Sequence, residues 1–191
     1  MDYDYTTLNE IKKHNTSEGE FKKLLKSLGK TKEDDIPLSY EHILNVTNWH
    51  VAIWTLKTYR GPKQNIVNFI CSIADLFLPI YEKDYPNDTR VRDTLAGARK
   101  GIWNIGAYDA ADAAGYAIYD AEDDAEDDAD VVVLAAWIAD AAADAAADAA
   151  AIYCASAAAR AISFAIAANK DVIPQIKILF LEHFGEGKLS C

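Results

Sequence analysis

Apolar side chains recur at helical spacing through the first part of the chain, and residues that cap helices precede them. Thr7 with Glu10, and Ser17 with Glu20, form capping boxes, in which a hydroxyl and a carboxylate three residues later satisfy the free amides of a new helix. The second helix should end at Gly29. Its apolar stripe consists of Phe21, Leu24, Leu25 and Leu28. Because this stripe needs a neighbour to cover it, we expect two short helices that pack against another part of the chain.

The next capping residues are Ser39 and Asn48. Ser39 should cap a turn of helix that reaches Leu44. Asn48 should cap a helix over Trp49–Arg60, and Gly61 and Pro62 should end that helix. The tryptophans of this chain are expected to anchor the core, with each indole N–H reaching a partner or water.

The segment Ile66–Ile80 is apolar on nearly every face, which is typical of a central helix. After a turn over Tyr85–Asp88, a basic helix is expected from about Thr89 to Trp103. Its cations are Arg90, Arg92, Arg99 and Lys100. We expect them to pair with nearby acidic helices rather than to bind nucleic acid.

Alanine dominates the second half of the chain, in Tyr108–Tyr119 and Val131–Asn169, and predicts long helices with a break near Ala150 or a protruding hairpin. Asp171, with Pro174 in the first turn, starts a last helix. These patterns predict an all-α fold: a multi-helix bundle with long alanine-rich helices and a small N-terminal helical appendage. The polar stretch 30–35 places the boundary, giving an appendage over residues 1–38 and a bundle domain over 39–191.

Charge is distributed very unevenly along the chain, whose formal net charge is −11. Between Ala107 and Ala168 lie thirteen acidic residues and a single basic one, Arg160, so the rest of the chain is close to neutral. An acidic surface repels nucleic acid and anionic membranes and favours basic partners. We therefore expect no direct nucleic-acid binding and no membrane binding.

Within that segment, Asp140, Asp144 and Asp148 recur four residues apart, on one side of a predicted helix. We take the following carboxylates as the candidate partner-binding residues: Asp109, Asp112, Asp120, Asp123, Asp127, Asp140, Asp144 and Asp148. Two other interpretations stay open. The carboxylates could serve only solubility, or they could mimic the phosphates of a nucleic acid.

Motifs for catalysis are missing from the sequence. Its histidines form no metal-binding pattern, and no nucleophile motif or Gly-rich phosphate loop occurs. The acidic run Glu122–Asp128 lacks the EF-hand spacing. We expect no enzyme, cofactor or metal. Three scattered cysteines, without a signal peptide or apolar span, favour the cytoplasm.

One stretch resembles a known family. Trp49–Leu56 (WHVAIWTL), Phe77–Arg90 (FLPIYEKDYPNDTR) and the helix that follows to Trp103 are similar to the Imm-5-like family of bacterial immunity proteins. The resemblance covers about residues 45 to 184, and implies an all-α bundle that neutralises a toxin by direct binding. This chain departs from the family pattern at Val91, where proline is usual, and in carrying Asp for many Arg and His residues of the alanine helices.

These observations together predict a protein-binding inhibitor or immunity-type protein whose partner is basic, either a toxin or a nucleic-acid-processing enzyme. A nucleic-acid mimic that blocks such an enzyme is the first alternative. An enzyme without a readable motif is the second. A homodimer is also open, because alanine lets helices of two copies approach closely.

Overall fold

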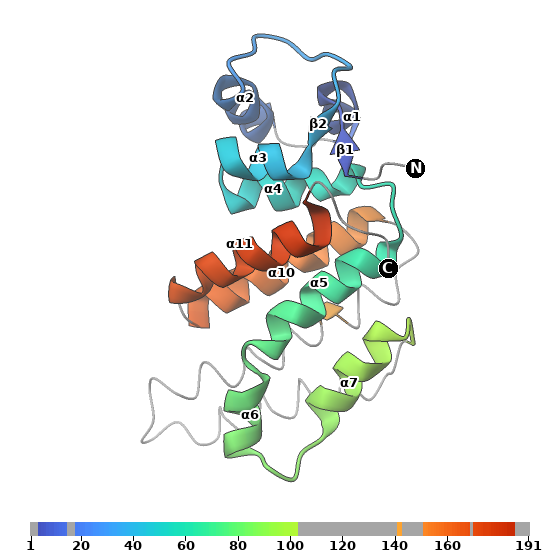
Figure 1. The fold of residues 1–191 in the computed structure, drawn as a ribbon, viewed down its shortest axis with the longest axis vertical. Helices are drawn as coiled ribbons and strands as arrows, with labels where there is room; N and C mark the ends of the chain where they lie inside the picture. The colour runs from blue at the N-terminus through green and yellow to red at the C-terminus, as the bar shows by residue number, and fades with distance from the viewer. Residues whose placement is uncertain (1–3, 15–17, 103–140, 143–150, 169, 186–191) are drawn as a thin grey trace.

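Helices dominate the fold, as the spacing of the apolar residues predicts. The computed structural model describes residues 4–14, 18–102, 141–142, 151–168 and 170–185. In chain order they form β1 (Tyr5–Thr6), α1 (Leu8–Lys13), α2 (Glu18–Ser27), β2 (Leu38–Ser39), α3 (Tyr40–Val46), α4 (Trp49–Thr55), the 3₁₀ helix η1 (Leu56–Thr58), α5 (Lys63–Asp75), α6 (Leu78–Asp84), α7 (Arg90–Arg99), α10 (Ala151–Ala168), the 3₁₀ helix η2 (Lys170–Val172) and α11 (Ile173–Phe184) (Figure 1). The all-α class is confirmed, and the bundle arrangement stays a prediction.

Three predicted N-caps are confirmed. The side chain of Thr7 accepts a hydrogen bond from the Glu10 amide at 3.2 Å, Ser39 one from the His42 amide at 3.1 Å, and Asn48 one from the Val51 amide at 3.0 Å. The Glu10 carboxylate does not complete the first capping box, because it pairs with Lys13 and Arg60 instead. The hydroxyl of the second box, Ser17, lies outside the described residues.

A two-stranded sheet was not expected from the sequence. β1 and β2 pair antiparallel, with Tyr5 opposite Ser39 and Thr6 opposite Leu38, at the place where the sequence predicts a domain boundary. Buried side chains of α1 and α2 belong to the same hydrophobic cluster as the helices after residue 38. These are Leu8, Ile11, Phe21 and Leu24. The strand pair therefore joins the N-terminal helices to the body of the protein (Figure 1).

The predicted central helix is interrupted. α5 ends at Asp75 and α6 begins at Leu78, with Pro79 in its first turn. Proline has no amide hydrogen, and its ring clashes with the carbonyl four residues earlier, here that of Asp75, so an unbroken helix through this point is disfavoured. α5 keeps the expected central place, because α10, α11, α6 and α7 all contact it.

The helix after Asn48 is shorter than expected. It ends as α4 at Thr55 and tightens into η1 instead of reaching Arg60. Two buried hydroxyls bond to backbone carbonyls there, Thr55 to Ala52 at 2.7 Å and Thr58 to Thr55 at 2.8 Å. Hydroxyl groups that bond back to the helix backbone compete with the regular helix, which accounts for the early end.

The last helix, α11, has Pro174 in its first turn, as predicted, and it ends before Gly185. Its aromatic face forms the centre of the core. The ring of Phe184 lies 5.3 Å from that of Tyr59 and 5.5 Å from that of Phe69, and Phe180 contacts both Phe69 and Phe184. This cluster joins α11 to α5 and to the segment after η1.

No helix in the described part of the chain is both long enough and apolar enough to cross a membrane.

Candidate functional site

All of the candidate partner-binding carboxylates lie outside the described residues. They are Asp109, Asp112, Asp120, Asp123, Asp127, Asp140, Asp144 and Asp148. Their role therefore stays a prediction from the sequence. The expected break near Ala150 and the segment Glu122–Asp130 also lie outside the described residues.

The described part of the acidic, alanine-rich segment is built into the core. Ala141 and Ala142 are buried, and so is one face of α10. The buried side chains of α10 are Ala157, Ala158, Ala161, Ile162 and Ala165. Arg160 and Ser163 are exposed. Because α10 lies against α4, η1 and α5, alanine serves there as a small side chain that lets helices pack closely.

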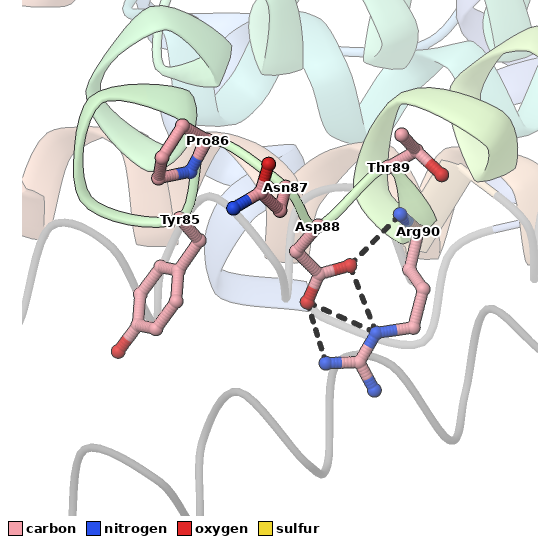
Figure 2. A pocket seen from close by; sticks show the side chains of 6 residues that line it. All are labelled: Tyr85, Pro86, Asn87, Asp88, Thr89 and Arg90. Atoms are coloured by element: carbon pink, nitrogen blue, oxygen red, sulfur yellow. Dashed lines mark hydrogen bonds and ion pairs between the residues drawn. The ribbon is translucent and has the colours of Figure 1, made fainter.

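A cluster of polar side chains lies at the turn between α6 and α7. The Asp88 carboxylate accepts hydrogen bonds from the Arg90 amide at 3.0 Å and from Arg90 Nε at 2.9 Å, and Arg90 Nη2 lies 2.6 Å from Asp88 Oδ2 (Figure 2). The same carboxylate therefore binds both the first backbone amide of α7 and the side chain of its first arginine. The sequence predicted this turn but not the role of Asp88; an Asp just before the expected helix start was the available signal.

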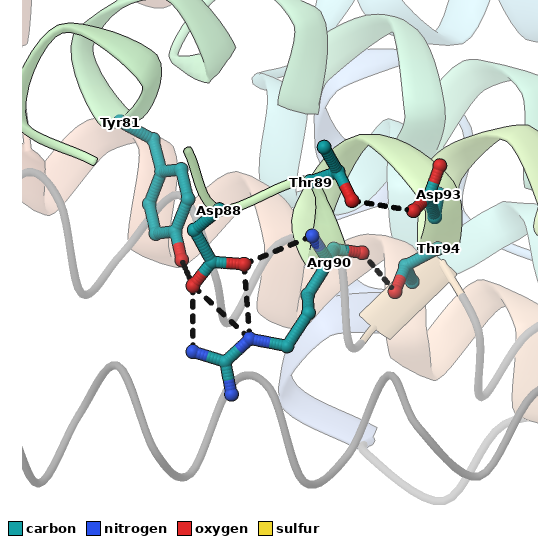
Figure 3. Close-up of polar contacts among 6 residues, drawn as sticks. All are labelled: Tyr81, Asp88, Thr89, Arg90, Asp93 and Thr94. Atoms are coloured by element: carbon teal, nitrogen blue, oxygen red, sulfur yellow. Dashed lines mark hydrogen bonds and ion pairs between the residues drawn. The ribbon is translucent and has the colours of Figure 1, made fainter. Parts of the chain in front are cut away.

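A second helix helps to hold this carboxylate. The Tyr81 hydroxyl, from α6, donates to Asp88 Oδ2 at 2.9 Å (Figure 3). Burial raises the pKa of Tyr81 to about 12, so this hydroxyl keeps its proton at ordinary pH. The Arg90 side chain, with further help from the Arg90 amide and from Tyr81, holds the pKa of Asp88 well below its ordinary value. Asp88 is thus a charged anchor between α6 and α7.

An open pocket of about 550 Å³ adjoins this anchor, lined by Tyr85, Pro86, Asn87, Asp88, Thr89 and Arg90 (Figure 2). The charge of Arg90 is already matched by that of Asp88. The Thr89 hydroxyl donates to Asp93 at 2.8 Å, and that of Thr94 to the Arg90 carbonyl at 2.8 Å (Figure 3). These contacts stabilise the turn between α6 and α7, because the polar groups named here bond to one another.

Replacing Asp88 with Asn should destabilise the protein by about 1–2 kcal/mol at pH 7, because the charge-assisted bonds to Arg90 are lost at a partly exposed site. The pKa of Asp88 is lowered from its ordinary 3.8, so its contribution to stability is complete above that value. It should fall as the pH drops toward the lower pKa of the folded state. Urea unfolding of the wild type and of Asp88→Asn from pH 7 to pH 3 should therefore show a difference in unfolding free energy that narrows below about pH 4.

The matched control is Asp75→Asn. Asp75 pairs with Arg99 on α7, and its side chain is 48% exposed, so this change should cost less than about 0.5 kcal/mol. Two results would contradict the anchoring role of Asp88: equal losses of stability in the two variants, or a stability difference between the wild type and Asp88→Asn that does not change with pH.

The other arginines of α7 also have carboxylate partners. Arg92 Nε donates to Glu82 of α6 at 2.8 Å, and Arg99 pairs with Asp75 of α5. Internal pairing therefore occurs for Arg92 and Arg99, with carboxylates of α6 and α5. The carboxylates of the alanine-rich segment, with which pairing was also expected, lie outside the described residues.

The three histidines whose side chains are described lie in different elements. His14, directly after α1, and His42, on α3, are exposed, whereas His183 is half-buried on α11. His183 Nε2 lies 3.3 Å from the Ser72 hydroxyl, which also donates to the Asn68 carbonyl at 2.9 Å. This contact links α11 to α5. Among the described residues, no three His, Cys, Asp or Glu side chains are grouped to hold a metal ion.

Cys71 should resist alkylation in the folded protein. It is fully buried in α5, and burial raises the pKa of its thiol to about 12, so little thiolate forms at pH 8. Peptide mass spectrometry after iodoacetamide treatment should find Cys71 unlabelled in buffer and labelled in urea. The peptides of Cys154 and Cys191 are read separately. Similar labelling rates for Cys71 in the two solutions would refute this expectation.

Comparisons with models of known protein families, with curated proteins and with solved structures found no match. The resemblance to the Imm-5-like family thus stays a prediction from the residues quoted above.

Proposed function

We propose that this chain is a non-enzymatic inhibitor of the immunity type, which neutralises a basic partner protein by direct binding through an acidic helical surface. The observation that carries the proposal is the concentration of charge. Thirteen carboxylates and one cation lie between Ala107 and Ala168, whereas acidic and basic residues nearly balance in the rest of the chain. Solubility alone does not require this concentration, because scattered charges would serve it equally well.

Ion pairs among the described residues outside the acidic segment support this interpretation. Glu10 pairs with Lys13 and Arg60, Glu33 with Lys12, and Glu82 with Arg92. These carboxylates thus have cationic partners, and the excess negative charge belongs to one stretch of sequence. α10 forms the C-terminal part of this stretch, and one of its faces is buried in the core. A helix packed in this way would hold a binding surface next to it in place.

A partner with a basic surface fits such a region best, because oppositely charged surfaces attract at long range and fix the orientation of binding. We propose a toxin or a nucleic-acid-processing enzyme as that partner, and the cytoplasm as the compartment. Association should be sensitive to salt, since exposed charges are screened over about 8 Å at physiological ionic strength.

The test is an affinity pull-down from the cytoplasm of the host cell, at low and at high salt, with the wild type and the triple variant Asp140→Asn, Asp144→Asn, Asp148→Asn. We expect one basic protein to be retained by the wild type at low salt. The triple variant should bind it at least tenfold more weakly, because three charge contacts are lost. Surface plasmon resonance with the purified partner gives the affinities.

The matched control removes the same number of carboxylates from outside the acidic segment, as Glu18→Gln, Glu33→Gln and Asp75→Asn. This control should keep its partner. If the partner stays bound at high salt, or if both triple variants lose it equally, the acidic segment is not the contact surface.

The second candidate function is nucleic-acid mimicry. Asp140, Asp144 and Asp148 recur every four residues, and this spacing on a helix corresponds to about 6 Å, close to the separation of phosphates along a strand. A mimic must compete with nucleic acid for the partner. Fluorescence anisotropy of a labelled oligonucleotide bound to the captured partner would fall on adding the protein; no change in anisotropy would exclude mimicry and leave inhibition at another surface.

A further inference from the structure

We draw no further inference here: the strongest candidate, the open pocket at the turn between α6 and α7, carries nothing because it is a helix N-terminus whose first amide and arginine are both already bonded to Asp88, and no unpartnered buried polar side chain in the described part of the chain points into it.

Discussion

Replacing Phe184 with alanine should cost about 3–5 kcal/mol of stability, the usual loss when a buried aromatic side chain is removed from a core. Phe184 is fully buried at the end of α11 and contacts the rings of Tyr40, Tyr59, Phe69 and Phe180. These rings come from α3, the segment after η1, α5 and α11, so the substitution opens a cavity where several elements meet. Urea unfolding followed by far-ultraviolet circular dichroism measures the loss.

The matched control is Ile178→Ala in the same helix. Ile178 is 57% exposed, so the unfolding free energy of this variant should lie within about 0.5 kcal/mol of that of the wild type. Because natural domains are stable by only about 5–15 kcal/mol, Phe184→Ala should raise the unfolded fraction at 37 °C. A loss below about 1 kcal/mol would mean that α11 does not close the core as described.

Replacing Ala161 with leucine should cost about 3 kcal/mol, at the upper end of the range for an enlarged side chain in a packed core. Ala161 is fully buried on the face of α10 that lies against α4, η1 and α5. Close helix packing leaves no room for three additional carbon atoms, so the helices must separate or the side chain must adopt a strained rotamer. The free energy of unfolding again measures the effect.

Ser163→Leu is the control for this change. Ser163 lies two positions further along α10 and is exposed, so leucine there should change stability by less than about 0.5 kcal/mol. Both variants add a leucine to the same helix, and they differ in which face receives it. If Ala161→Leu is tolerated as well as Ser163→Leu, alanine on this face reflects helix propensity alone and not close packing.

The same stability measurement is also needed to interpret the binding test. A variant that loses its partner because the core is damaged would resemble one that loses a contact residue. Asp140→Asn, Asp144→Asn and Asp148→Asn should therefore be accepted as contact variants only if their unfolding free energy stays near that of the wild type.

Much of the local structure could be predicted because its causes are close together in the sequence. Thr7, Ser39 and Asn48 each bond to an amide three residues later, so the two partners are visible in a short window. The end of α2 follows from Gly29, whose φ of 65° is easily reached only by glycine. Pro79 also indicates the break after α5. The prediction missed it because the apolar pattern of Ile66–Ile80 is continuous across that proline.

The candidate site was predicted only as a set of charges. Clustering of carboxylates is a property of the sequence, and it indicates a basic partner without showing which side chains would touch it. Asp88 was missed for a related reason: its neighbour Arg90 is close in sequence, but the Tyr81 hydroxyl that completes the anchor comes from a different helix.

By itself, the sequence determined the helical class, the positions of three N-caps and the concentration of negative charge in one segment, because each depends on near neighbours or on composition. The tertiary structure decided the pairing of β1 with β2, the partners of Arg92 and Arg99, and the aromatic cluster around Phe184. Those contacts join residues that are distant in the chain. Helical periodicity states which face of a helix is apolar, but not which other face will cover it, and that choice is made only when all the helices pack together.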